Sequence, residues 1–166
     1  MSMRLPLILL VGLLAVPAAL AAPSATGDGV LELKAVNANR AVIQGNRGAI
    51  WGQLDKGTLR VSDLNPDDNL FPLVSGAEIV APSMVDPNVT IYSGKNIHFR
   101  FSGGKYTFSI SGTGIDVTAV GVGRAWLTGA GTFDDGDYAV DDGKWQAVPF
   151  LKKLITFGVQ PTVATP

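Results

Sequence analysis

Five aspartates near the C-terminus form the densest group of potential metal ligands in this chain. They lie in two short stretches, Asp134-Asp135-Gly136-Asp137 and Asp141-Asp142-Gly143. Carboxylate oxygens are the ligands that Ca²⁺ prefers, although neither stretch matches the twelve-residue calcium loop. Asp-Gly is also a preferred pair in tight β-turns. Two interpretations therefore stay open: turns alone at 135–136 and 142–143, flanking a strand from 138 to 140, or turns that also bind Ca²⁺. The candidate ligands are Asp134, Asp135, Asp137, Asp141 and Asp142.

Aromatic side chains are the candidates for binding a flat ligand such as a sugar ring, because an exposed ring offers contact area at little entropy cost. Five rings come into consideration: Trp51, Trp126, Trp145, Tyr92 and Tyr138. The candidate ligand-binding residues are Trp126, Trp145 and Tyr138. Trp126 is the strongest, since Ala125 and Leu127 bracket it and a strand would turn its ring away from their face. Packing in the core is the competing interpretation for every one of these rings.

The inventory of other reactive side chains is short. His98 is the only histidine and there is no cysteine, so multi-histidine and thiolate metal sites and cysteine nucleophiles are excluded. Glutamate occurs only at Glu32 and Glu78, which leaves little for the carboxylate pair of a glycosidase. We therefore expect no catalytic residue and no obligatory cofactor.

The elements that must position these residues are short strands. Apolar residues recur with period two, as in 97–101 and 106–110, and Gly, Asn and Asp interrupt them every eight to ten residues. Gly103-Gly104 between two alternating runs predicts a hairpin. With turns at 112–114 and 121–123, residues 97–127 predict a meander of about four strands. The first half predicts strands by the same pattern, and we expect one antiparallel β-sandwich or flattened barrel of about ten strands.

Three segments depart from this pattern. Residues 65–87 hold four prolines and predict a long connection with a short edge strand near 77–80. Residues 148–157 are the best helical candidate, but the segment is short and we interpret it as a final strand or loop. Residues 33–45 and 117–129 share five identical positions, which favours either similar hairpins or a duplicated hairpin.

The N-terminus has the three parts of a secretory signal peptide. Residues 1–4 are cationic, residues 5–16 are apolar without a charge, and Ala19-Leu20-Ala21 offers small residues before a cut between Ala21 and Ala22. This predicts a signal peptide at 1–21, a disordered stretch at 22–29, one all-β domain at 30–159 and a disordered tail at 160–166. We expect the protein to be secreted or associated with the cell envelope, without a transmembrane span after cleavage.

The charge of the chain excludes one class of partner. It carries 13 Lys and Arg against 14 Asp and Glu, and removal of Arg4 with the signal peptide leaves 12 against 14. This balance argues against a nucleic-acid binder that works through bulk electrostatics. A cell-envelope component or a polysaccharide is the partner that we expect.

Residues 90–136, TIYSGKNIHFRFSGGKYTFSISGTGIDVTAVGVGRAWLTGAGTFDDG, carry a recognisable pattern. It consists of Tyr-Ser-Gly-Lys, Phe-Arg, Gly-Ile-Asp with Ala-Val-Gly, and Leu-x-Gly-x-Gly. The pattern resembles an uncharacterised group of small exported β-rich proteins of high-GC Gram-positive bacteria. The resemblance implies an exported β domain and assigns no activity.

Taken together, these features predict a non-catalytic structural or binding module. The alternative is an extracellular carbohydrate-recognition domain or an enzyme that uses the 65–87 loop and the Asp-rich turns.

Overall fold

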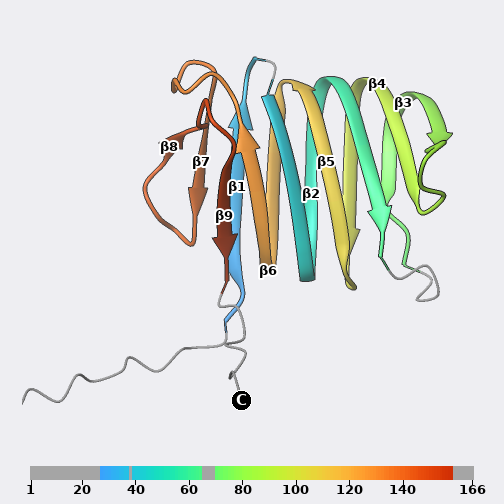
Figure 1. Cartoon of the computed structure of the whole chain (residues 1–166), viewed down its shortest axis with the longest axis horizontal. Coiled ribbons are helices and arrows are strands. Elements are labelled where there is room, and N and C mark those ends of the chain that lie inside the picture. Colours follow the sequence, from blue (N-terminus) through green and yellow to red (C-terminus); the bar gives the residue numbers. More distant parts are fainter. Residues whose placement is uncertain (1–26, 38, 65–69, 159–166) are drawn as a thin grey trace, which may run out of the picture.

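The protein is built from strands, as the alternating pattern predicts. The computed structural model describes residues 27–37, 39–64 and 70–158, and these residues form strands and turns and no helix. Nine strands pair antiparallel in one sheet that does not close into a barrel (Figure 1). The strands are β1 (Gly29–Ala35), β2 (Asn39–Asp63), β3 (Leu73–Pro82), β4 (Val89–Ser102), β5 (Tyr106–Thr113), β6 (Ile115–Thr128), β7 (Gly136–Val140), β8 (Gln146–Ala147) and β9 (Lys153–Phe157).

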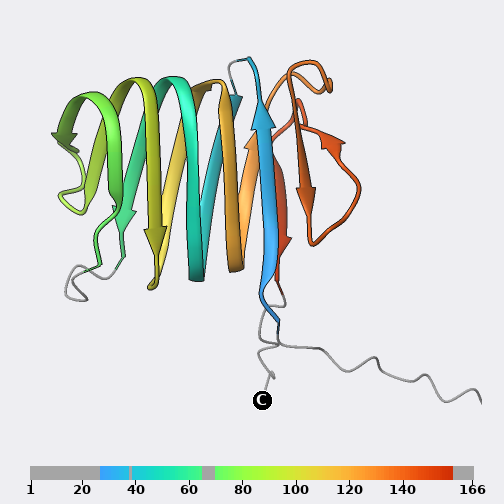
Figure 2. The same cartoon turned by 180° about the vertical axis from the view of Figure 1, so that it is seen from behind.

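The sheet is coiled into a flattened sandwich of two layers (Figures 1 and 2). The pairing of β5 shows how: one side of β5 pairs with residues 39–45 of β2, and the other side pairs with residues 56–63 of the same strand. Because β5 lies between two parts of β2, β2 must leave this layer, cross the other layer at residues 49–54, and return.

Each layer consists of neighbouring segments of these bent strands. The layer that contains β5, here the β5 layer, runs in spatial order through residues 77–82, 89–94, 57–63, β5, 39–45, 122–128 and β9. The layer that contains β1, here the β1 layer, runs through residues 73–75, 97–102, 49–54, 115–120, β1, β7 and β8.

The hydrophobic core lies between the two layers. Leu31, Ile43, Ile50 and Leu59 are fully buried, and they come from both layers. Ile97, Phe99, Phe101, Phe108 and Ile110 are also buried, as the alternation predicts. Each such side chain contributes about 1.5–3 kcal/mol when removed from water. Packing of alternate side chains therefore holds the layers together without a disulfide.

The expected hairpin at Gly103-Gly104 is wrong. Both glycines have positive φ, 95° and 54°, as a tight turn requires. However, β4 pairs with β2 and β3, and β5 pairs only with β2, so the chain arches from one layer to the other. The four-strand meander fails for the same reason, and residues 115–128 form one strand that bends at Gly121 instead of two strands joined by a turn. A hairpin and an arch share the same alternation of apolar residues, so the pattern alone does not distinguish them.

The segments outside the regular pattern follow the predictions in part. The edge strand expected near 77–80 exists as β3, which is longer and spans both layers. Residues 153–157 form β9, in agreement with a final strand. Before residue 30, Gly29 begins β1 and Asp28 forms an ion pair with Arg47 at 2.9 Å.

The similar segments 33–45 and 117–129 lie side by side, with Leu33 opposite Val117, and both lead from the β1 layer to the β5 layer. Whether they are a duplication stays a prediction. The predicted signal peptide, residues 22–26 and the predicted tail lie outside the described residues. Within the described ranges, we find no helix with the length and apolar character needed to cross a membrane.

Candidate ligand-binding face

The outer surface of the β1 layer carries an ordered array of polar side chains around one tryptophan. Three neighbouring segments contribute two outward residues each, because alternate residues of a strand point to the same side. Register pairing places Arg100 and Thr118 on either side of Trp51, and His98 and Asp116 on either side of Gln53. We call these six residues the Trp51 face. Directly paired side chains in such rows have Cβ atoms about 4.5–5.5 Å apart, within reach of one small ligand.

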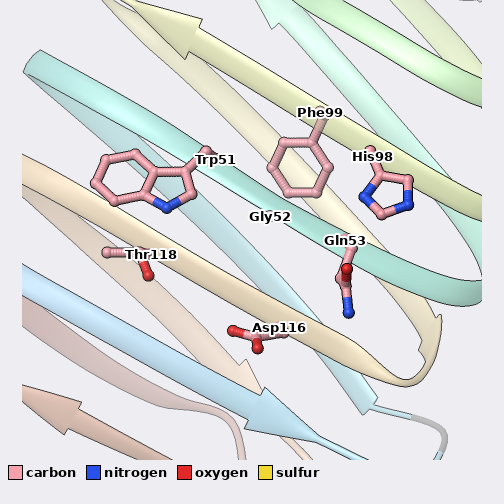
Figure 3. Close-up of a pocket in the computed structure, with 7 residues that line it drawn as sticks. All are labelled: Trp51, Gly52, Gln53, His98, Phe99, Asp116 and Thr118. Atoms are coloured by element: carbon pink, nitrogen blue, oxygen red, sulfur yellow. The ribbon is translucent and has the colours of Figure 1, made fainter.

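The Trp51 face is hollowed. A depression of about 360 Å³ is lined by Trp51, Gly52, Gln53, His98, Phe99, Asp116 and Thr118 (Figure 3). Figure 3 shows Trp51 and His98 at opposite sides of this hollow, with Phe99 between them. A second hollow of about 280 Å³ adjoins it, because His98 and Phe99 line both. Together they form a trough across the outer surface of β3, β4, β2 and β6.

Gly52, near the middle of β2, lines the hollow and occupies a position that requires glycine. A Cβ atom at this position would lie 2.3 Å from the backbone oxygen of Asp116. The backbones of β2 and β6 therefore approach each other in a way that only glycine permits.

The polar groups of the Trp51 face are available for a ligand. Within the described residues, Arg100, Gln53, His98 and Asp116 form no side-chain hydrogen bond or ion pair with the rest of the protein. Together they offer both donors and acceptors. Trp51 is 42% exposed, and among the described residues no cation lies over its ring, although Arg100 is its register partner. The array can therefore stack a flat or puckered ring and hydrogen-bond its substituents at the same time.

Trp126 points outward as predicted, between the buried side chains of Ala125 and Leu127. Its ring is half-buried and lies beside two cations. The Arg124 guanidinium is 5.2 Å from the ring centroid, and the Lys152 ammonium is 5.8 Å away. Arg124 also donates a hydrogen bond from Nε to the Gln44 side chain at 2.7 Å, which fixes the guanidinium in place. A ligand would have to displace these groups to stack on Trp126.

Trp145 and Tyr138 lie at the other end of the β1 layer from β3. Trp145 is 37% exposed, with the Lys34 ammonium 5.1 Å from its ring centroid. Tyr138 is only 2% exposed, and its hydroxyl donates to Gln146 and accepts from Lys153. Because the Tyr138 ring is packed in the core, it has almost no surface to offer a ligand.

Most of the candidate aspartates lie in turns. The turn expected at Asp142-Gly143 has a different pair of central residues. Asp141 and Asp142 have positive φ, 50° and 58°, and Gly143 donates to the Val140 carbonyl at 2.8 Å. The two-residue turn is therefore Asp141-Asp142, with Gly143 after it, because Asp tolerates the left-handed conformation almost as readily as Asn. The Asp141 carboxylate accepts a hydrogen bond from the Val30 amide at 2.9 Å, which ties the turn to β1.

Asp135 serves a different turn. Its carboxylate accepts hydrogen bonds from the Thr132 hydroxyl at 2.5 Å and from the Asn37 side-chain amide, and these bonds lower the pKa of the carboxyl below its usual value. The amides of Asp135 and Gly136 both donate to the Thr132 carbonyl, so the turn begins before the expected Asp-Gly pair.

The five candidate calcium ligands are not gathered into one site. Asp134 is exposed, Asp135 and Asp141 are engaged in the turns above, and Asp137 lies in β7 opposite Lys34. In the part of the chain that the structure describes, no three His, Cys, Asp or Glu side chains lie close enough together to hold a metal ion.

Residue patterns in the sequence do not identify the Trp51 face as a unit. The direction of Trp51 follows from the same alternation that placed Trp126, since Ile50 and Leu54 of the same segment are buried. The association of Trp51 with His98 and Asp116 does not follow from local pattern, because it needs the pairing of β2 with β4 and β6.

The fold is an antiparallel, flattened β-sandwich, and an open trough crosses the outer surface of its β1 layer. Comparisons of the chain with family models, with curated proteins and with solved structures found no match.

Proposed function

We propose that this protein is an exported, non-catalytic module that binds a polysaccharide of the cell envelope on its Trp51 face. The observation that carries the proposal is the exposed Trp51 ring surrounded by unpartnered polar side chains from two neighbouring strands. The signal-peptide pattern of residues 1–21 supports a site of action outside the cytoplasm.

A saccharide fits the chemistry of this face better than an apolar ligand. A sugar ring presents C–H groups to an aromatic face and hydroxyls around its rim, so it needs stacking and hydrogen bonding at one place. Trp51 supplies the stacking surface, and Gln53, His98 and Asp116 supply donors and acceptors beside it. The trough crosses four strand segments spaced about 4.8 Å apart, so it extends over about 14 Å. This length suits more than one sugar ring and therefore a chain.

Binding is favoured over hydrolysis by the composition of the hollow. Asp116 is the only carboxylate among the residues that line it. Glycoside hydrolysis usually needs two carboxylates on either side of the scissile bond. The hollow also lies open on a sheet surface, where water is not excluded from a bound ligand.

Binding of soluble polysaccharides tests this proposal. We expect the wild-type protein to be retarded in affinity electrophoresis through at least one gel of a panel of soluble cell-wall polysaccharides and β-glucans, and titration with oligosaccharides of the same polymer to quench tryptophan fluorescence. Trp51→Ala should weaken binding by roughly 30-fold, the loss of about 2 kcal/mol that is typical of an aromatic hot spot.

Trp126→Ala is the matched control, because it removes a tryptophan from the β5 layer and leaves the Trp51 face intact. We expect the Trp126 variant to bind as the wild type does. Retention of binding by Trp51→Ala, or no binding of any polysaccharide by the wild type, would contradict the proposal.

A further inference from the structure

The exposed large apolar side chains gather at the two ends of the flattened sandwich. Among the described residues, only Val36 and Trp51 of this class lie elsewhere. The end formed by β3 and its flanking loops, here the β3 end, carries Leu64, Phe71, Leu73, Ile79, Val80, Met84 and Val85. The opposite end, here the β9 end, carries Phe133, Trp145, Phe150, Leu151 and Leu154. Several exposed apolar side chains in one region of a protein surface often mark an interaction surface.

Each end of the sandwich carries strands with a single partner (Figures 1 and 2). At the β9 end, β8 pairs only with β7 among the described strands and lies farther out than β9. In the described structure, β3 pairs only with β4, and β9 pairs only with β6. An edge strand offers unpaired N–H and C=O groups to another strand. Natural sheets protect such edges with short strands, lysines or interior prolines. β3 is ten residues long, holds no lysine, and has its single proline at its last position.

The charges of the two edges are complementary. Glu78 is the only charged residue of β3, and the sequence from 61 to 94 contains no lysine or arginine. At the β9 edge, Lys152 and Lys153 are adjacent, and residues 143–158 contain no carboxylate side chain. Pairing of β3 with a second β3 would bring two Glu78 carboxylates together, whereas pairing of β3 with β9 brings opposite charges together.

The direction of the strands permits continuous stacking of copies. Every neighbouring pair in the β5 layer is antiparallel, and six steps separate residues 77–82 of β3 from β9. β3 and β9 therefore run in the same direction. A second copy in the same orientation would place its β3 parallel to β9 of the first and would continue the β5 layer.

From these observations we infer that the partner of the β3 end is the β9 end of a second copy of this chain. The contact is heterologous, so it leaves one free end of each kind and generates linear assemblies of more than two copies. This inference is independent of saccharide binding, because the Trp51 face lies on the broad surface between the two ends. An assembly of this kind would place many Trp51 faces in one row.

Light scattering and sedimentation velocity over a range of concentrations test the assembly. We expect the wild-type protein to form a concentration-dependent series that passes beyond the dimer. The variant Ile79→Lys/Val80→Lys alters the β3 end, and Leu151→Asp/Leu154→Asp alters the β9 end. All four side chains are more than half exposed, so the fold should survive, and circular dichroism checks this. Each variant alone should lose association by at least about tenfold.

Mixing the two variants gives the decisive result. The first variant keeps an intact β9 end and the second keeps an intact β3 end, so their mixture should form a one-to-one heterodimer and nothing larger. Val36→Lys, which removes an exposed apolar side chain away from both ends, should assemble as the wild type does.

Three outcomes would overturn the inference. They are a wild-type protein that stays monomeric at millimolar concentration, an assembly that stops at a dimer sensitive only to the β3 variant, and a mixture of the two variants that contains no heterodimer.

Discussion

Gly48 of β2 and Gly121 of β6 are direct register partners at the point where both strands bend from one layer into the other. Their φ angles are 125° and 131°, a region that side chains other than glycine rarely adopt. A Cβ atom on Gly48 would lie 1.9 Å from the Val120 carbonyl oxygen, and one on Gly121 would lie 2.2 Å from the Arg47 oxygen. Close backbone contact and backbone conformation therefore both require glycine at this bend.

We predict that Gly121→Ala lowers the free energy of unfolding by at least about 2 kcal/mol, since the φ value alone costs about 1–3 kcal/mol and the contact with Arg47 adds to it. Urea denaturation followed by tryptophan fluorescence measures the change. Gly27→Ala is the control, because no atom lies within 4 Å of a Cβ there. Equal stability of the two variants would show that the bend does not depend on glycine.

Phe108 offers a second test of the fold, because the arch at Gly103-Gly104 places β5 in the layer opposite residues 97–102 of β4, where their aromatic side chains meet in the core. The Phe108 ring on β5 packs against Phe99 and Phe101 on β4, with centroids 5.5 Å and 6.1 Å away, although β4 and β5 share no ladder. We expect Phe108→Ala to cost about 3–5 kcal/mol in chemical denaturation. Ser109→Ala, on the outward face of the same strand, should change stability by less than about 0.5 kcal/mol. A small effect of Phe108→Ala would mean that the two layers are not joined through this cluster.

The sequence predicts the faces of the strands but not their partners. Burial of Phe99, Phe101 and Phe108 follows from period-two alternation, which is a property of a single strand. Pairing is a property of two strands, and Gly103-Gly104 has the same positive φ values whether it joins neighbours or spans two layers. The expectation of a meander therefore failed at pairing while the predicted core was confirmed.

The difference between the face of a strand and its pairing partners also explains which parts of the candidate site could be predicted. The outward direction of Trp126, and of Arg124 two residues earlier in the same strand, could be predicted from alternation. The Lys152 side chain beside the Trp126 ring could not, because it comes from the segment before β9. Trp51 has His98 as a near neighbour only because residues 49–54 cross between β4 and β6. Long-range register, rather than residue type, decides which tryptophan is open to a ligand.

Alkaline pH should destabilise the protein through Tyr106. This side chain is 1% exposed, and burial raises the pKa of its phenol well above the usual 10.0. The unfolded chain releases the phenolic proton near pH 10 while the folded protein retains it. The free energy of unfolding is therefore unaffected by this group below pH 10 and falls above it, with a slope of up to about 1.4 kcal/mol per pH unit.

Tyr106→Phe removes the group that ionises. We expect the variant to show a shallower loss of stability than the wild type when urea denaturation is repeated from about pH 9 upward. Tyr92, whose pKa burial also raises, stays in both proteins and leaves a residual slope. Parallel curves for the two proteins above pH 10 would show that ionisation of Tyr106 is not coupled to unfolding.

Asn39 joins two turns that are far apart in sequence. Its side chain is buried, and its Nδ2 group donates to the carbonyl oxygens of Asn37 at 2.9 Å and Asp135 at 3.1 Å. The loop before β2 is thereby tied to the turn before β7. The Oδ1 atom faces Gly129, where a Cβ would lie 1.9 Å from it, so the site has no space for a larger group.

We predict that Asn39→Asp destabilises the protein by about 3–5 kcal/mol at neutral pH, because it replaces two donors with a buried carboxylate that faces two carbonyl oxygens. Asn39→Ala, which leaves the carbonyls unpaired without adding a charge, should cost about 1–3 kcal/mol. Asn88→Asp on an exposed turn is the matched control and should be nearly neutral.

Burial raises the pKa of a carboxyl above its usual value of about 3.9. The loss of stability caused by Asn39→Asp should therefore develop as the pH rises above about 3.9. It should shrink in acid, where the protonated carboxyl can donate one hydrogen bond. Urea denaturation at two pH values measures this difference, and a penalty that does not change with pH would place the cost in packing instead of charge.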